Sequence, residues 1–258
     1  MLLTIDIGNT NIKFGVYTGE VLVAHWRIAT ERQRLADEYA VIIRNLFLLD
    51  GIGIEQIAGC AISCVVPPLT GQFRDLVRNL LGVEPLFASS RVETGLRYSI
   101  DTPNELGADR VCNSLAAYRR HGSPVIAVAF GTATALDIVV GEGEYIGGAI
   151  APGIGISADA LFRLAAKLYS VELVRPPSAI GKNTAHYMQS GLILGYAGLV
   201  EGLVRRIGDE LGYRPKVIAT GGLADVIAAE TDAINVVEPM LTLEGLRLMY
   251  ELHTMKAE

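Results

Sequence analysis

The chain has 258 residues, half of them hydrophobic, and a formal net charge of −6. This length can bury one large core or two cores of roughly 100 to 150 residues each, and we expect two domains. The acidic balance argues against a general nucleic-acid-binding protein, which usually carries a basic face. No apolar run approaches the ~20 residues of a membrane span, and the first residues lack the basic start of a signal peptide. We therefore expect a cytoplasmic protein.

The first part of the chain has the pattern of an α/β layer. Apolar runs separated by turn residues predict strands, and the 3.6-residue spacing of apolar side chains predicts helices. The expected elements are strands at residues 2–7, 11–17 and 21–29, a helix at 34–49, a strand at 57–66, a helix at 69–81 and a short strand at 85–88.

The second part repeats this order. A polar, irregular segment at 91–103 leads into a helix that begins near Asn104, its expected N-cap. The further elements are strands at 124–130, 135–140 and 145–151, helices at 157–168 and 184–211, a strand at 216–222 and a helix from Leu223. We therefore predict two similar domains, at residues 1–115 and 116–258.

Two glycine turns stand at matching places in these halves. Gly8 lies in the segment Asp6-Ile7-Gly8-Asn9-Thr10-Asn11, and Gly131 lies in Ala129-Phe130-Gly131-Thr132-Ala133-Thr134, each after an apolar strand. A glycine lets backbone N–H groups approach an anion closely, and Asn and Thr side chains add neutral donors. The pair of turns predicts that two domains bind one nucleotide phosphate chain between them, as in a kinase or ATPase.

The first turn predicts a charged pair. If the loop centres on Asn9 and Thr10, antiparallel pairing sets Asp6 opposite Lys13. The Lys13 ammonium could then neutralise phosphate oxygens, and the Asp6 carboxylate could hold Mg²⁺ through water. The alternative is a surface hairpin with an ordinary cross-strand ion pair.

A second candidate site is the segment Glu105-Leu106-Gly107-Ala108-Asp109-Arg110. Asp109 falls near the first turn of a helix and can accept a proton from an attacking hydroxyl, while Arg110 can bind an anionic group. The alternative is an acidic residue that is placed to suit the helix dipole.

Five strings in this order resemble the type III pantothenate kinases. They are DIGNTN with Lys13, ELGADR at 105–110, FGTAT at 130–134, GGAIAPG at 147–153 and IGKNT at 180–184. The resemblance spans nearly the whole chain. It implies an actin-like ATPase (ASKHA) fold of two ribonuclease-H-like domains, a homodimer, and ATP-dependent phosphorylation of pantothenate, the first step of coenzyme A biosynthesis.

The resemblance also implies roles for individual residues. Asp109 resembles the catalytic base. The residues that resemble ATP contacts are Asp6, Ile7, Gly8, Asn9, Thr10, Asn11, Ile12, Lys13 and Thr132. The residues that resemble pantothenate contacts are Tyr98, Gly107, Ala108, Asp109, Arg110 and Thr184.

One position departs from the family pattern. Members usually have an aspartate at the position of Ala129, and that carboxylate is associated with a bound monovalent cation such as K⁺ or NH₄⁺. Alanine offers no side-chain oxygen. We therefore expect the cation site to be absent or weak, or the nucleotide affinity or activity to be changed.

Further glycines leave two questions open. Gly191, Gly195, Gly198 and Gly202 share one face of the expected helix, and interior glycines cost about 1 kcal/mol each relative to alanine, so something should pack closely there. That neighbour is either a partner subunit or the chain's own sheet. Similarly, the segment 220–222 is either a nucleoside contact or a simple turn.

These features favour a pantothenate kinase that uses ATP and Mg²⁺. The first alternative is a nucleotide-binding regulatory homologue that has lost kinase activity, as Ala129 could indicate. The second is an actin-like kinase for another hydroxyl substrate. Nucleic acid and membranes are not expected partners.

Overall fold

The structure is a computed structural model that describes residues 1–165 and 167–255. The described chain forms two compact units: unit 1 contains Met1–Ala116 and the segment from Leu241, and unit 2 contains Ala117–Met240. This differs from the predicted division into 1–115 and 116–258, because the C-terminal helix packs in unit 1. Within the described ranges, no helix has the length and apolar character needed to cross a membrane.

Unit 1 is built on a sheet with the order β3-β2-β1-β4-β5. Its strands are β1 (Leu2–Ile7), β2 (Asn11–Thr18), β3 (Val21–Ala29), β4 (Gly59–Cys64) and β5 (Leu86–Phe87). The first three form an antiparallel meander, and β4 and β5 add in parallel beside β1. The predicted strands of the first half are thus confirmed.

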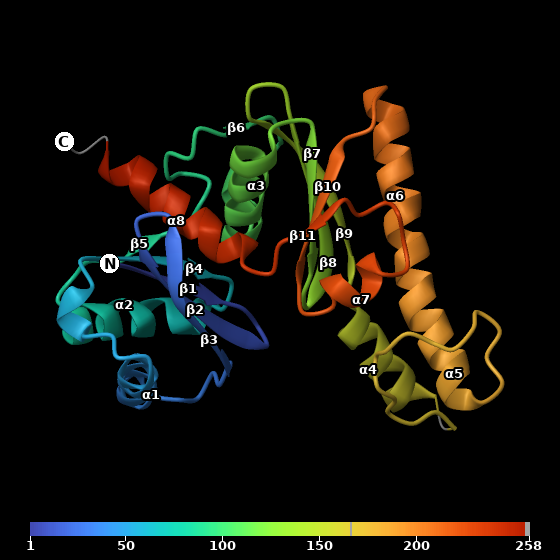
Figure 1. The fold of residues 1–258 in the computed structure, drawn as a ribbon, viewed down its shortest axis with the longest axis horizontal. Coiled ribbons are helices and arrows are strands. Elements are labelled where there is room, and N and C mark those ends of the chain that lie inside the picture. Colours follow the sequence, from blue (N-terminus) through green and yellow to red (C-terminus); the bar gives the residue numbers. More distant parts are fainter. Residues whose placement is uncertain (166, 256–258) are drawn as a thin grey trace. The chain divides into compact units, whose positions relative to one another are not determined.

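Two helices cover one face of this sheet, α1 (Ala36–Leu49) and α2 (Pro67–Leu81) (Figure 1). The 3₁₀ turn η1 (Ile54–Gln56) precedes β4. Alternate strand residues point into the core against the apolar stripes of both helices. Fully buried members of this core are Leu3, Ile5, Ile7, Ile12, Phe14, Ile62, Tyr39 and Phe73. Proline at the first helical positions lets α2 begin at Pro67, two residues before the predicted start.

The other face of the unit 1 sheet is covered by α8 (Leu241–Thr254), a helix that was not predicted from the sequence. Close approach requires glycine at two strand positions. A Cβ at Gly15 would lie 3.1 Å from Leu243 Cδ1, and one at Gly59 would lie 2.0 Å from the Tyr250 hydroxyl. These contacts between segments far apart in sequence explain why the C-terminal helix belongs to unit 1.

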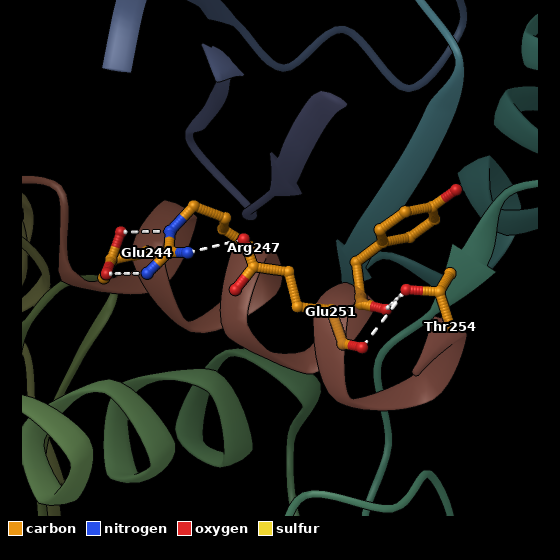
Figure 2. Close-up of polar contacts among 5 residues, drawn as sticks. Glu244, Arg247, Glu251 and Thr254 are labelled. Carbon is orange, nitrogen blue, oxygen red and sulfur yellow. Dashed lines mark hydrogen bonds and ion pairs between the residues drawn. The ribbon is translucent and has the colours of Figure 1, made fainter. Parts of the chain in front are cut away.

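A buried arginine stabilises α8. Arg247 donates hydrogen bonds to Glu244 at 3.0 and 2.6 Å and to Glu251 at 2.6 Å, and Figure 2 shows these contacts along the helix. Its side chain is 4% exposed, and its guanidinium lies 5.9 Å from the centre of the Tyr17 ring. The Glu244 and Glu251 carboxylates raise the pKa of Arg247, so the guanidinium stays charged although it is buried.

We expect Arg247→Ala to lower the free energy of unfolding by about 3 kcal/mol, since removing one partner of a buried ion pair leaves the other uncompensated. The value is at the low end of the usual range because Glu251 keeps 40% exposure. Urea unfolding measures this change, with Arg44→Ala on the exposed side of α1 as the control. Equal losses in the two variants would contradict the role of Arg247.

Unit 2 repeats the strand arrangement of unit 1. Its strands are β7 (Val125–Phe130), β8 (Ala133–Val140), β9 (Glu144–Pro152), β10 (Lys216–Gly221) and β11 (Val236–Val237). They are ordered β11-β10-β7-β8-β9, so β7 has the place of β1, with an antiparallel meander on one side and parallel strands on the other. The predicted repetition of strands is confirmed.

The helices of unit 2 pack on the face that carries Ile126, Val128 and Phe130. They are α4 (Ile154–Leu164), α6 (Gly195–Leu211) and α7 (Ala224–Ala228), whereas α5 (Thr184–Gln189) contributes no residue to this core. The predicted helix at 184–211 is present as one helical run. Within it, a π-helical turn, η3 (Ser190–Leu194), joins α5 to α6. Asn183 caps α5 by accepting a 2.9 Å hydrogen bond from the His186 N–H.

The prediction that the helix carrying Asp109 begins near Asn104 is wrong. Residues Pro103–Glu105 form a separate 3₁₀ turn, η2, and α3 begins at Ala108 and runs to His121. The Asn104 side chain does not cap a helix, because its Oδ1 accepts a 2.9 Å hydrogen bond from Arg91. A short strand, β6 (Arg97–Tyr98), precedes this region.

Candidate active site

The first glycine turn has the predicted register. Gly8 N–H donates to Asn11 O at 3.0 Å, and Asp6 lies opposite Lys13 on the antiparallel β1–β2 pair. The register continues across the sheet, with Ser63 of β4 beside Asp6 and Arg27 of β3 beside Lys13. A hydroxyl, a carboxylate, an ammonium and a guanidinium therefore form one row on four adjacent strands.

Burial dominates the electrostatics of Asp6. It raises the pKa of Asp6 from its ordinary value of 3.8 to about 6. The Lys13 charge opposes this shift most strongly, and the Ser63 hydroxyl also lowers the pKa, whereas the Asp109 charge raises it further. The Asp6 Oδ1 atom is buried and has no hydrogen-bond partner within the described residues. An unpaired buried carboxylate oxygen is costly, so this site favours a bound cation or donor.

The side chains of the turn divide into two groups. Asn9 and Thr10 are exposed at its tip. Ile7 and Ile12 are fully buried in the core. Their predicted contact with a nucleotide is therefore restricted to backbone atoms.

Asp109 lies in the first turn of α3, where the helix dipole favours a negative charge. Its Oδ1 accepts a 2.9 Å hydrogen bond from Arg110 N–H. A Cβ at Gly107 would lie 2.7 Å from this same oxygen, so glycine leaves the space that the carboxylate occupies. Burial raises the pKa of Asp109, although the Arg110 N–H and the Arg110 charge lower it.

Unit 1 brings several predicted residues together with one that was not predicted. The Asp109 charge acts on Asp6, and both carboxylates raise the pKa of the buried Cys112 thiol in addition to burial. Tyr98 is near the same thiol; its pKa is raised mainly by burial, and its hydroxyl lies 3.3 Å from Thr94 Oγ1. Asp6, Lys13, Tyr98 and Asp109 therefore belong to one region of unit 1.

The second glycine turn is tighter than the first. Gly131 N–H donates to Ala133 O at 3.0 Å, and Gly131 and Thr132 are exposed at the tip. Gly153 supports this turn: its N–H donates to Thr132 O at 3.0 Å, and a Cβ there would lie 2.4 Å from the same oxygen. The two turns thus share their place after a central strand but differ in length.

The neighbours of Ala129 are small or neutral. It pairs with Ala135 on β8 and with Thr220 on β10, whose buried hydroxyl has no hydrogen-bond partner among the described residues. At the next position, Gly221 has φ +107° and approaches β7 so closely that a Cβ would lie 2.3 Å from Phe130 O. This packing accounts for Gly221 as a structural turn residue.

Thr184, the last of the predicted substrate contacts, is the first residue of α5 in unit 2. It is half-buried, directly after the Asn183 cap.

The residues present fit a magnesium ion bound mainly through water. Within the described ranges, no group of three or more His, Cys, Asp or Glu side chains could enclose a metal. Mg²⁺ usually keeps several waters and uses one or two carboxylates together with substrate phosphates. Asp6, with its unpartnered buried oxygen, is the residue that matches this need.

Comparison with known proteins decides the family. The family model "Type III pantothenate kinase" matches residues 2–206. The chain belongs to the type III pantothenate kinase family. It is 71% identical over 253 residues to the type III pantothenate kinase of Roseiflexus sp. strain RS-1, covering 98% of this chain and 99% of that protein. It is 50% identical to the Moorella thermoacetica member, covering 98% and 100%.

Solved structures agree on the fold of this pantothenate kinase family member. The ROK hexokinase from Thermus thermophilus has a TM-score of 0.54 at 15% identity, covering 99% of both chains. Component A of (R)-2-hydroxyglutaryl-CoA dehydratase from Acidaminococcus fermentans has a TM-score of 0.57 at 16% identity, covering 99% of this chain and 98% of that one. The fold is thus the predicted actin-like ATPase fold.

The glycine face identified in the sequence is open in unit 2. Gly191, Gly195 and Gly198 are exposed, and Gly202 is half-buried. Apart from the neighbouring backbone of its own helix, a Cβ at any of the four would meet no described atom within 4 Å. Close packing on the chain's own sheet therefore does not explain these glycines.

Sequence reasoning missed three residues of the region around Asp6. Ser63 and Arg27 join the row only through strand register, and Cys112 reaches Asp6 only because α3 packs in unit 1. Ser63 and Arg27 could have been found by pairing the predicted strands 21–29 and 57–66 residue by residue with the glycine-turn hairpin.

Proposed function

We propose that this chain transfers the γ-phosphoryl group of ATP to the primary hydroxyl of pantothenate, the first step of coenzyme A biosynthesis. Family membership over residues 2–206 supports the reaction class. The single observation that carries the assignment of residues is the half-buried Asp109 carboxylate at the start of α3, in the same region of unit 1 as Asp6 and Lys13.

The first glycine turn is the proposed phosphate site. Phosphoryl transfer spreads negative charge over the transferred group, so catalysis depends mainly on positioning and electrostatic stabilisation. The Lys13 ammonium supplies a positive charge at the base of the turn, and Asn9 and Thr10 supply donors at its tip. Thr132 at the tip of the second turn is the proposed further contact with ATP.

Asp6 would hold Mg²⁺ through water. The metal, when bound, would neutralise charge on the β- and γ-phosphate oxygens. For the protein, the relevant property is that Asp6 must be ionised to bind it, and burial opposes this by raising the pKa to about 6. Lys13 and Ser63 favour the ionised form and so prepare Asp6 for this role.

Asp109 is the proposed general base. It would accept the proton of the pantothenate hydroxyl as the oxygen attacks the phosphoryl group. Burial raises its pKa and thereby makes the carboxylate a stronger base than an exposed aspartate. Gly107 and Ala108 leave room beside it, while Tyr98, Arg110 and Thr184 are the proposed further contacts, with Arg110 suited to the pantothenate carboxylate.

The test is release of ADP by purified protein with ATP and Mg²⁺, with and without pantothenate. We expect ADP only when pantothenate is present. ATP binding without ADP release would instead identify a nucleotide-binding regulatory homologue, and release with other hydroxyl substrates would identify a kinase of different specificity. A cytoplasmic location stays a prediction.

Cation dependence is the property in which this enzyme is expected to depart from its family. Because Ala129 and its register partners Ala135 and Thr220 offer no carboxylate, we expect similar turnover in K⁺, NH₄⁺ and Na⁺. The matched variant Ala129→Asp should gain activation by K⁺. Strong K⁺ activation of the unchanged protein would show that the cation has other ligands.

We also propose that the protein is a homodimer and that the open glycine face of η3 and α6 lies at its interface. Large apolar side chains of unit 2 are exposed as well: Ile150 by 63%, Leu164 by 86% and Tyr187 by 59%. A partner subunit would remove this apolar area from water. At such an interface the glycines let two helices approach closely. This close contact would offset the free energy that each interior glycine costs the helix relative to alanine.

Gly198→Leu should weaken this dimer. Overpacking a close contact costs about 1–3 kcal/mol, so we expect the dimer Kd to rise about tenfold or more. Sedimentation measures the assembly, and circular dichroism checks that the helix itself persists, since leucine favours helix over glycine. A dimer of unchanged affinity would place the interface elsewhere.

A further inference from the structure

The segment that follows β3 holds the tip of the first glycine turn through three hydrogen bonds. Thr30 Oγ1 donates to Gly8 O at 2.7 Å, and Thr30 N–H donates to Thr10 O at 3.0 Å. Arg32 Nη2 donates to Asn9 Oδ1 at 2.9 Å. Thr30 and Arg32 carry no role in the phosphate site as derived from the sequence.

All three bonds have the same polarity. In each, the segment 30–32 is the donor and the turn is the acceptor. Two carbonyl oxygens of the turn and the side-chain oxygen of Asn9 are therefore occupied. Such oxygens would repel the phosphate oxygens of a nucleotide if they faced it, whereas amide donors attract them.

The bond from Arg32 also fixes the orientation of the Asn9 amide. An amide group has an acceptor oxygen on one side and two donor hydrogens on the other. With Oδ1 directed to the guanidinium, Nδ2 points away from it, and Nδ2 makes no hydrogen bond within the described residues. The exposed Asn9 side chain thus presents donors at the tip of the turn.

We propose that Thr30 and Arg32 are positioning residues that orient the first glycine turn for the phosphates of ATP, with Arg32 acting through Asn9. This inference rests on the proposed function, because it assigns these residues to the same nucleotide site. The occupied acceptors leave the turn with donors directed at an anion.

The decisive experiment is a double-mutant cycle on nucleotide affinity. The Kd for MgATP is measured by calorimetry for the unchanged protein, Arg32→Ala, Asn9→Ala and the double variant. We expect Arg32→Ala to raise the Kd about tenfold, the usual size of one hydrogen bond to a charged group. In the Asn9→Ala background the same substitution should have little further effect, because its partner is gone.

Thr30→Val tests the hydrogen bond from Thr30 Oγ1 to Gly8 O, since valine keeps the shape of the side chain but removes the hydroxyl donor. It should also raise the Kd for MgATP, while the KM for pantothenate stays unchanged. Arg44→Ala, an exposed arginine of α1, is the control for lost surface charge.

Several results would overturn the proposal. One is an unchanged Kd for MgATP in Arg32→Ala, whether or not the melting temperature falls. Another is additivity of the effects of Arg32→Ala and Asn9→Ala on this Kd, which would indicate a separate contact of Arg32 with the nucleotide. Absence of MgATP binding to the unchanged protein would overturn it together with the kinase assignment. MgATP binding without phosphorylation of pantothenate would refute the proposed reaction alone, since the cycle measures only nucleotide binding.

Discussion

Replacing Asp109 by asparagine is expected to lower kcat for pantothenate phosphorylation by roughly 10²-fold or more, the usual size of a general-base effect. Asparagine keeps the shape of the side chain but cannot take up the proton of the hydroxyl. Burial raises the pKa of Asp109, so its carboxylate is a stronger base than an exposed aspartate, and asparagine removes that base. Initial rates at saturating ATP and pantothenate measure the change.

The binding of ATP should separate this role from a general loss of structure. We expect the Kd for MgATP of Asp109→Asn to stay close to that of the unchanged protein. The exposed Asp101, eight residues before it, provides a control as Asp101→Asn, which should keep its rate. A rate of Asp109→Asn equal to that of the control would mean that Asp109 is not the base.

Replacing Asp6 by asparagine is expected to have opposite effects on stability and activity. The folded protein raises the pKa of Asp6 from 3.8 to about 6, so the folded state binds this proton more tightly than the unfolded state does. The stability that the proton contributes is complete below about pH 4 and is lost as the pH rises through about 6. Above that pH, the buried negative charge destabilises the fold.

Asparagine is neutral at every pH and avoids this cost. The shift in pKa corresponds to about 3 kcal/mol, so Asp6→Asn should be up to about 3 kcal/mol more stable at about pH 8, with the advantage vanishing near pH 4. Turnover should nevertheless fall strongly, because the proposed magnesium ligand is lost. Urea unfolding across this pH range measures the stability, and Asp101→Asn is again the control. If the extra stability of Asp6→Asn did not change with pH, it would contradict the conclusion that the fold buries the Asp6 charge.

The sequence predicted the strands of this fold well, because local patterns determine them. The apolar run bounded by turn residues predicted the strand at 11–17, and the loop at Asn9 and Thr10 predicted the register that pairs Asp6 with Lys13. Family motifs predicted the actin-like fold. These features depend on neighbours within a few residues.

Contacts between distant segments were not predicted. Helix α8 packs in unit 1 because Gly15 and Gly59 leave room for it, and no local pattern connects residue 59 with residue 250. The start of α3 was misplaced because Asn104, a good cap by residue type, is instead held by Arg91. Thr30 and Arg32 reached the glycine turn only through the course of the chain after β3.

Transfer of label from γ-labelled ATP is the direct measurement of phosphoryl transfer to pantothenate. Pantothenate is incubated with purified protein, labelled ATP and Mg²⁺, in parallel with Asp109→Asn, and the products are separated. We expect labelled 4′-phosphopantothenate from the unchanged protein and almost none from Asp109→Asn. Unlabelled pantothenate with the unchanged protein, or equal labelling with both proteins, would contradict it.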